Sequence, residues 1–304
     1  MKIKIQVRIL VSRLNLNLML IKHILRRSFS NNLENWYLQF KAWLLSRKPI
    51  EGNRKVLPPS DYELVFEDNF DKSKLSDEWR ISQPWGEFHP GSLRQYWPKD
   101  NSCVYISPEG LVLELRNYPK TFLKSDLPPW QQKPELPDEF TIDWAAGLVF
   151  LKQPYTFGWF EAEIQLPVDR AQWAAFWLSG KETWPPEIDV FESYTSGNPN
   201  DISIEPNIHW GSEDNGTKKD YGAPRIYVKD ADKRFVQYAV HWTKDFIKFY
   251  YDGQLVQVAK NKEMLSDNAA PQNVILNNGI NKGDGLTSNE SAMLVRNIKI
   301  YQKK

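Results

Sequence analysis

The sequence predicts an all-β domain, folded as a sandwich of antiparallel sheets and preceded by a short basic extension. After residue 57 the apolar residues stop recurring with a helical period and alternate with polar ones in short runs. Gly, Pro, Asn and Asp separate these runs, as turn residues separate strands. The run FIKFYYDGQLVQVA (246–259) has two such halves around Asp252-Gly253, a dipeptide that favours the tight turn of a β-hairpin. Many short strands in succession are typical of a single antiparallel sandwich.

Residues 1–57 are predicted to form an N-terminal extension that is partly helical or disordered. Residues 1–32 contain no acid, and their longest apolar run (18–21) is far short of the ~20 residues that span a bilayer. They lack the apolar core and cleavage site of a standard signal peptide. A basic amphipathic helix here could contact a membrane or act as a targeting segment; a disordered tail and a misassigned start codon are the alternatives. A second amphipathic helix is predicted over residues 33–46, packed on the main domain and followed by a linker rich in proline and charge.

Charge and composition narrow the partners of the main domain. Residues 1–56 carry twelve Lys or Arg and two acids, a net charge of +10, whereas residues 57–304 carry 27 and 36, a net charge of −9. A mildly acidic domain argues against a nucleic acid as its partner. The single cysteine, Cys103, excludes an internal disulfide and a thiolate metal cluster, and four histidines do not suggest a His-rich metal site. The thirteen Trp and thirteen Tyr can stack on sugars or fill a core.

Three further alternating runs are predicted strands. They are LVLELRN (111–117), GWFEAEIQLP (158–167) and NIKIYQ (297–302), the last of which closes the domain. In the second run the apolar residues occupy every second position, so they share one face of the strand, opposite Glu161 and Glu163. The proline- and tryptophan-containing segment 118–143 is predicted to be a long loop, and long loops on a sandwich often border a binding site.

The stretch PPEIDVFES (185–193) carries three acids with uneven spacing. Glu187 and Asp189 are two residues apart and share a face of a strand, whereas Glu192 would point away from them in a regular strand. One extra residue between Asp189 and Glu192, a β-bulge, would bring all three onto one face. Two glutamates that lean inward there could approach the ~5–5.5 Å separation at which a retaining glycosidase uses one as nucleophile and the other as acid and base.

A solvated acidic strand explains the same three acids without any chemistry. Like charges this close repel one another, however, so a purely structural strand has little reason to keep three. Three tryptophans also lie nearby in the sequence: Trp173, Trp177 and Trp184. Acids clustered among aromatic side chains favour a sugar-binding site.

The acid stretch resembles the motif of glycoside hydrolase family 16, which reads E-x-D-x-E, or E-x-D-x-x-E in a bulged branch. The residues from Glu187 to Glu192 fit the bulged form. Five further blocks resemble those of the family in the same order over residues 62–302: ELVFEDNFD (63–71), AGLVFLKQPYTFGWFEAEIQLP (146–167), WAAFWLSG (173–180), FVQYAVHWTKDFIKFYYDGQLV (235–256) and MLVRNIKIYQ (293–302). Each block alone is a weak signal, but the ordered set is a strong one.

The resemblance implies a β-jelly roll of two stacked sheets with a cleft on its concave face, formed by residues 58–304 as the catalytic domain. It implies endo-hydrolysis of a β-linked polysaccharide with retention of configuration, through a glycosyl-enzyme formed by double displacement. By position in the motif, Glu187 corresponds to the nucleophile, Asp189 to an assisting carboxylate and Glu192 to the acid/base.

Within the bulged branch the expected substrate is a β-1,3- or β-1,3-1,4-glucan such as laminarin. The enzymatic rivals are a hydrolase of an algal galactan (agar, porphyran or carrageenan) and a transglycosylase. The rival without activity is a carbohydrate-binding jelly-roll module, against which the intact set of three acids argues. The acidic balance of the domain favours a neutral glucan over a sulfated galactan. We expect a monomer that acts outside the cell or at its surface, with polysaccharide as its partner and no cofactor.

Five further residues are candidates for substrate binding. Trp177 and Trp184 match aromatic positions beside the family motif, although core packing is the alternative for each. His209 lies where the following strand could bring it near the acid/base, and a satisfied histidine at a strand end is the alternative. Gln95 and Tyr96 resemble an early position of the family near the cleft.

Arg296 departs from the family pattern, which usually has an aspartate at this position. In many members that aspartate helps to hold a structural calcium on the convex face, with groups near the first strand. Because a guanidinium repels a cation, we expect no calcium here and no other metal site. We expect Arg296 to form an ion pair with Glu67 or Asp68 instead.

Overall fold

The computed structural model describes residues 49–52, 54–89, 92–168, 172–195, 202–211, 219–220, 225–280 and 290–304. All of them belong to the compact unit Lys41–Lys304. The helices predicted over the basic segment and over residues 33–46 lie outside the described residues. Within the described part of the chain, no helix is both long and apolar enough to cross a membrane.

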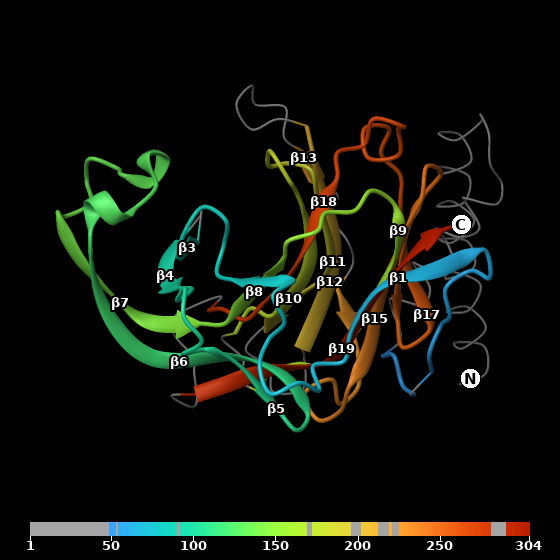
Figure 1. Cartoon of the computed structure of the whole chain (residues 1–304), viewed down its shortest axis with the longest axis horizontal. Helices are drawn as coiled ribbons and strands as arrows, with labels where there is room; N and C mark the ends of the chain where they lie inside the picture. The colour runs from blue at the N-terminus through green and yellow to red at the C-terminus, as the bar shows by residue number, and fades with distance from the viewer. Residues whose placement is uncertain are drawn as a thin grey trace, which may run out of the picture. The chain divides into compact units, whose positions relative to one another are not determined.

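Two sheets form the described part of the chain, and they confirm the all-β sandwich (Figure 1). The larger sheet has the order β17 (Gln254–Ala259), β16 (Ile247–Tyr251), β15 (Val236–Trp242), β9 (Gly158–Gln165), β19 (Glu290–Lys303), β6 (Gly110–Leu123), β7 (Glu139–Ala146), β4 (Ser92–Tyr96) and β3 (Phe88–His89), with β1 (Tyr62–Asp68) on β19 and β5 (Val104–Ser107) on β6. The smaller sheet has the order β13 (Lys219–Asp220), β12 (Ile202–Trp210), β11 (Glu187–Thr195), β10 (Ala175–Gly180), β18 (Gln272–Asn277), β8 (Leu148–Leu151) and β2 (Trp79–Ile81), with β14 (Ile226–Tyr227) on β12.

The two sheets pack on each other through an apolar core. Apolar and polar residues alternate along the strands, so the apolar ones share the face that lies in this core. Phe160, Ala162 and Ile164 of β9 are fully buried in this core, as the pattern in 158–167 predicts. Side chains of the smaller sheet meet them there: Phe176, Leu178, Ile188 and Val190. Burial of each large apolar side chain contributes roughly 1.5–3 kcal/mol, so this layer is a main source of stability.

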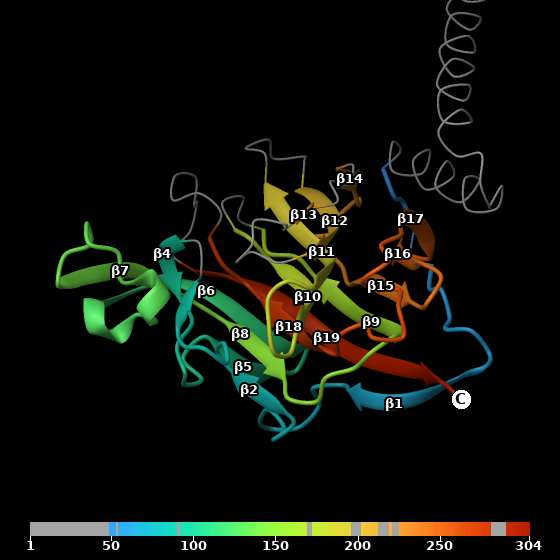
Figure 2. The same cartoon turned by 90° about the horizontal axis from the view of Figure 1, so that it is seen from above.

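The predicted hairpin and the predicted closing strand are both confirmed. Strands β16 and β17 pair around Asp252 and Gly253, whose φ angles of 45° and 73° are those that a tight hairpin turn requires. The final run lies in β19, which pairs with β1, β6 and β9. Figure 2 shows β1 running beside β19.

The prediction of a long loop over residues 118–143 is wrong. Strands β6 and β7 continue as a hairpin, and only residues 124–138 between them are irregular, with the short 3₁₀ helices η1 (Lys124–Asp126) and η2 (Pro129–Gln131). Figure 1 shows this hairpin extending from the larger sheet at the left. Pro119, one of the prolines of this segment, lies at a bulge between Asn117 and Lys120, where a missing N–H breaks no regular ladder bond.

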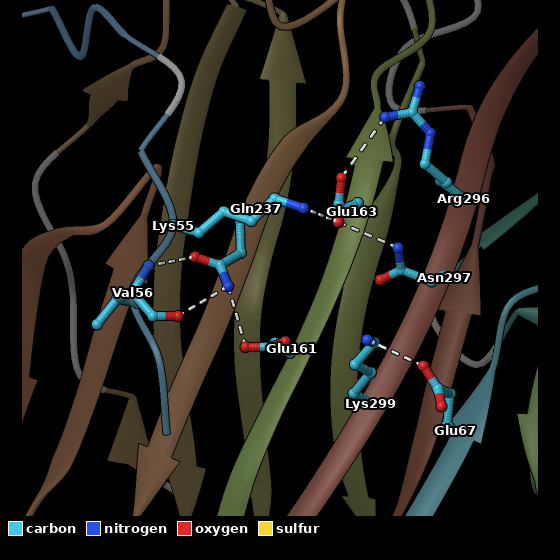
Figure 3. A network of polar contacts seen from close by, with 9 residues as sticks. All are labelled: Lys55, Val56, Glu67, Glu161, Glu163, Gln237, Arg296, Asn297 and Lys299. Atoms are coloured by element: carbon cyan, nitrogen blue, oxygen red, sulfur yellow. Dashed lines mark hydrogen bonds and ion pairs between the residues drawn. The ribbon is translucent and has the colours of Figure 1, made fainter. Parts of the chain in front are cut away.

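Residues 49–52 and 54–56, predicted as part of a linker, lie along the domain. Ile50 is fully buried and forms a parallel bridge with Val228. The backbone of Val56 both donates to and accepts from the side-chain amide of Gln237, with N–O distances of 2.8 and 3.0 Å. Lys55 forms an ion pair with Glu163 on the outer face of β9 (Figure 3). The contacts of Lys55 and Val56 join the segment to the larger sheet, whereas the domain boundary near residue 57 stays a prediction.

The predicted ion pair of Arg296 with Glu67 or Asp68 is wrong. Arg296 Nη1 lies 3.6 Å from Glu163 Oε2 (Figure 3). Its guanidinium lies 3.8 Å from the centre of the Phe235 ring. Glu67 is instead paired with Lys299, at 2.9 Å between Nζ and Oε1. Glu67 and Lys299 are opposite each other in the β1–β19 register, so the lysine takes the carboxylate that the sequence suggested for Arg296.

Candidate active site

Strand β11 carries the three acids and contains the predicted bulge. In the pairing of β11 with β12, Asp189 lies opposite Asn207 and Glu192 lies opposite Glu205. Two residues lie between the acids on β11, but only one residue lies between their partners on β12, so β11 has one extra residue. The same shift occurs against β10. The bulge between Asp189 and Glu192 is therefore confirmed from both sides of the strand.

The bulge puts all three acids on one face of the smaller sheet. Every second residue of β10 faces one side, and these residues pair with the acids: Ala175 with Glu192, Trp177 with Asp189 and Ser179 with Glu187. Because residues paired across strands share a face, the acids share one too. The two residues within the bulge, Val190 and Phe191, are both fully buried in the core between the sheets.

Glu187 is held by two neighbours that the sequence had named as candidates. Trp184 donates its indole Nε1–H to Glu187 Oε2 at 2.8 Å. His209 Nε2 lies 3.3 Å from Glu187 Oε1 and 3.2 Å from Asp189 Oδ2. The prediction that His209 lies near the acid/base Glu192 is wrong. Because β11 and β12 are antiparallel, the end of β12 returns to the start of β11, and His209 pairs with Glu187.

Burial and the neighbouring charges shift the ionisation of this group. Burial, and then the negative charge of Asp189, raise the pKa of Glu187 well above its ordinary value, and Glu192 raises it further. The charge of His209 and the hydrogen bond from Trp184 oppose this shift. The net shift is upward, so the folded protein holds a proton on Glu187 up to a higher pH than the unfolded chain does.

The raised pKa of Glu187 predicts that Glu187→Gln stabilises the fold at neutral pH. Between the ordinary value of 4.5 and the raised pKa, the folded state binds more protons than the unfolded chain. Stability from this group is thus present at low pH and lost as pH rises through the raised pKa. We expect the variant to melt several degrees above the wild type at pH 7, with the gap closing towards pH 4.

Melting temperatures of both proteins between pH 4 and pH 8 test this expectation. Glu182→Gln is the control, because that side chain is 78% exposed and its replacement should leave the melting temperature unchanged. A Glu187→Gln variant that melts below the wild type at pH 7, or a difference in melting temperature that does not change with pH, would contradict the raised pKa of Glu187.

Glu192 is bound by Trp173, which was not among the predicted site residues and which packs against two further aromatic rings. Trp173 donates its Nε1–H to Glu192 Oε1 at 3.0 Å. Its ring centre lies 5.2 Å from that of His89 and 6.4 Å from that of Trp97. Burial lowers the pKa of His89 to about 4, so this imidazole is neutral at neutral pH. Trp173 was visible near the acids in the sequence, but no local pattern joins His89 or Trp97 to Glu192.

The other three candidates for substrate binding, Trp177, Gln95 and Tyr96, differ in their relation to the face that carries the acids. Trp177 is 8% exposed, and its Nε1–H donates to Asn277 Oδ1 at 2.7 Å, so it forms part of the sheet face on which Asp189 lies. Gln95 is buried and accepts a hydrogen bond from the backbone of Ile280. Tyr96 packs in a separate apolar cluster, where its hydroxyl donates to the Tyr118 carbonyl. Their roles in substrate binding stay predictions.

The absence of a calcium ion beside Arg296 stays a prediction. Arg296 lines a surface hollow together with residues that follow the first strand and residues of the turn before β6: Asn69, Phe70, Asp71, Ser107, Pro108, Glu109 and Gly110. The guanidinium adds a positive charge to a lining that also holds the carboxylates of Asp71 and Glu109, and this charge disfavours a cation. Elsewhere among the described residues, Glu187, Asp189 and His209 offer donor atoms within 4.8 Å of one another, the one group there with the spacing of metal ligands.

We therefore expect calcium to leave the stability of this protein unchanged. Melting temperatures with millimolar calcium and with a chelator should agree within about one degree, since no ligand-binding free energy is added to the folded state. Arg296→Asp is the informative partner variant, because it restores a carboxylate to the hollow. A calcium-dependent rise of several degrees in the wild type would contradict the expectation.

Comparison with known proteins gives a family for this arrangement. A sequence model of "Glycosyl hydrolases family 16" matches residues 97–294. The "Endo-1,3-1,4-beta-glycanase EglC" of Rhizobium meliloti is 31% identical over 128 residues, 41% of this chain and 26% of that protein. The "Beta-glucanase" of Rhodothermus marinus is 27% identical over 221 residues, 68% of this chain and 69% of that protein. The chain thus spans about a quarter of the length of EglC.

Solved structures agree with the fold. The crystal structure of SCLam, described as a non-specific endo-beta-1,3(4)-glucanase from family GH16, superposes with a TM-score of 0.65 at 24% identity. The superposition covers 83% of this chain and 96% of SCLam. At this identity the likeness concerns the fold, whereas the family match covers more than half of the sequence. The chain belongs to glycosyl hydrolases family 16.

Proposed function

We propose that this protein is a retaining endo-β-glucanase that hydrolyses a β-1,3- or β-1,3-1,4-glucan. The observation that carries the proposal is the bulge in β11, which leaves Glu187, Asp189 and Glu192 on one face with an indole N–H on each glutamate. Family membership supports the substrate class, and so do EglC, the Rhodothermus protein and SCLam, which are named for their action on β-glucans or β-glycans.

The mechanism assigns one role to each acid. Glu187 attacks the anomeric carbon while Glu192 protonates the departing glycosidic oxygen, which gives a glycosyl-enzyme and a shortened chain. Glu192 then takes a proton from water, and that water displaces Glu187 from the anomeric carbon with a second inversion, so the net result is retention. His209 positions Glu187 and links it to Asp189, because His209 Nε2 lies 3.3 Å from Glu187 Oε1 and 3.2 Å from Asp189 Oδ2.

The two indole donors prepare the carboxylates for these roles. Trp184 holds Glu187 Oε2, which leaves its other oxygen on the side of His209, and its donated hydrogen bond favours the ionised form that attacks. Trp173 holds Glu192 Oε1 and fixes the rotamer from which the second oxygen can reach the leaving group. Neither indole takes or gives up a proton: both orient a carboxylate, and Trp184 also favours the ionised form of Glu187.

A panel of polysaccharides with detection of new reducing ends tests the proposal. We expect activity on laminarin and on mixed-linked β-glucan, and none for a Glu187→Gln/Glu192→Gln double variant. Proton NMR of the first product should show the β-anomer before mutarotation. Cleavage of agar, porphyran or carrageenan alone would move the substrate to a galactan, longer products with added acceptor would indicate a transglycosylase, and binding without cleavage would leave a carbohydrate-binding module.

A further inference from the structure

The bulge in β11 leaves a backbone carbonyl that the neighbouring strands do not pair in the regular way, and a residue of the opposite sheet binds it. A β-bulge disrupts the ladder locally, because its extra residue lies between two regular pairs. Here Tyr251 of β16 donates its hydroxyl to the Val190 carbonyl at 2.8 Å. Both residues are fully buried. This hydrogen bond crosses the core from the larger sheet to the strand that carries the acids.

The second residue of the bulge is held from the same side. The ring of Phe191 lies 4.4 Å, centre to centre, from the ring of Tyr238 on β15. Tyr238 in turn makes an edge-to-face contact with Tyr251, with centres 5.1 Å apart. Two adjacent strands of the larger sheet therefore contact both residues that separate Asp189 from Glu192.

The alternative to the bulge is a regular strand, in which the three acids would no longer share one face. In a regular strand Glu192 would turn towards the core, because shifting a strand by one residue exchanges its two faces. The same shift would bring Phe191 out of the core and away from Tyr238. A hydroxyl that binds the Val190 carbonyl and a ring that packs on Phe191 both favour the bulged state over this regular one.

We propose that Tyr251 is a positioning residue, whose hydroxyl fixes the Val190 peptide so that Glu192 stays on the face of Glu187. This proposal rests on the proposed hydrolase function for its catalytic consequence, but its structural consequence can be measured without any substrate. Burial keeps the Tyr251 hydroxyl protonated, because it raises the pKa of Tyr251 well above the ordinary value. The hydroxyl is thus a hydrogen-bond donor at neutral pH.

The pair Tyr251→Phe and Tyr238→Phe forms a matched experiment. Each variant removes one hydroxyl from a fully buried tyrosine of the same cluster. Only the first loses a hydrogen bond to the bulge, since the Tyr238 hydroxyl has no hydrogen-bond partner within the described part of the chain. We expect Tyr251→Phe to lower kcat about 10- to 100-fold with KM within about twofold of the wild type, because the acid is misplaced while the sugar contacts remain. Tyr238→Phe should keep both constants within about twofold.

Backbone hydrogen exchange supplies a readout that a general loss of stability would not reproduce. Exchange at residues 190–193, followed by mass spectrometry of short peptides, should rise in Tyr251→Phe and stay at the wild-type rate in Tyr238→Phe, while exchange in β9 stays unchanged in both. If the wild type hydrolyses no polysaccharide, the proposed function fails, and the exchange experiment alone decides the positioning role.

Two results would overturn the proposal. One is wild-type kcat and wild-type exchange in Tyr251→Phe; the other is an equal effect of the two variants. If Tyr251→Phe does not fold, NMR of the wild type replaces it. The Tyr251 hydroxyl proton should then exchange with water much more slowly than that of Tyr238, and equal rates would refute the hydrogen bond.

Discussion

Glu187→Ala and Glu192→Ala should each lower kcat on laminarin by at least about 10³-fold, because each removes a group that forms or breaks bonds in the proposed mechanism. Loss of activity alone does not assign the two roles, since either loss stops the reaction. Azide separates them, because it is a small nucleophile that can enter the space left by a deleted carboxylate. An aryl β-glycoside substrate with a good leaving group removes the need for an acid in the first step.

The anomer of the rescued product identifies the missing group. In Glu187→Ala, azide takes the place of the nucleophile and inverts the centre once, so an α-glycosyl azide forms. In Glu192→Ala, Glu187 still forms the glycosyl-enzyme, and azide then displaces it from the other side to give a β-glycosyl azide. Proton NMR distinguishes the two anomers. The same anomer from both variants, or the reverse assignment, would contradict the roles given to these residues.

Glu205→Gln is the control for the negative charge of the face itself. Glu205 lies opposite Glu192 in the β11–β12 register and accepts a hydrogen bond from Arg225 Nε at 3.1 Å. If only Glu187 and Glu192 take part in bond making, Glu205→Gln should keep kcat within about fivefold, and azide should not change its product.

The parts of this site that could be predicted from sequence are those encoded over a few neighbouring residues. The uneven spacing of Glu187, Asp189 and Glu192 predicts a bulge, because only an extra residue reconciles it with one face of a strand. The Asp252-Gly253 turn is likewise local, since its two residues tolerate positive φ. Both were confirmed by the structure.

The parts that could not be predicted depend on which strands become neighbours. His209 was assigned to the wrong glutamate because the pairing register of β11 and β12 depends on the connection between them, which the acid motif does not specify. Tyr251 lies in a strand that local patterns identify, yet its contact with Val190 crosses the core between two sheets. Contacts of this kind depend on the packing of distant segments, for which a single sequence offers no periodic signal.

Proline gave a misleading signal in β6 for a related reason. The prolines of residues 118–143, Pro119 among them, favoured a loop, because a proline cannot donate to a ladder. Pro119 instead lies at a bulge in the ladder. The hairpin continues beyond it, where Thr121 pairs with Thr141 and Phe122 with Phe140. The hydroxyls of that threonine pair lie 3.1 Å apart, within hydrogen-bonding distance. Pairing across strands thus overrides the local preference of one residue.

Gly147→Ala should be the most destabilising single methyl addition at the junction of the two sheets. Gly147 is the one residue between β7 of the larger sheet and β8 of the smaller one, and its own backbone bonds to Glu114 and Asn278 at 2.7 and 2.9 Å. A Cβ here would lie 2.3 Å from the Cys103 carbonyl oxygen and 2.8 Å from Leu113 Cα. Both are backbone atoms, so relief requires strands to move apart rather than a side chain to rotate.

We expect this clash to cost at least about 3 kcal/mol in the free energy of unfolding, measured by urea denaturation. Gly279→Ala is the matched control, because its added Cβ would meet side-chain atoms of Gln95 and Trp173 at 3.0 Å, and side chains can shift. Its cost should be near 1 kcal/mol. Since Trp173 binds Glu192, that smaller change in stability should be accompanied by a fall in kcat. If Gly147→Ala and Gly279→Ala lowered the free energy of unfolding equally, the close approach of backbone atoms to Gly147 would not be the cause of the destabilisation.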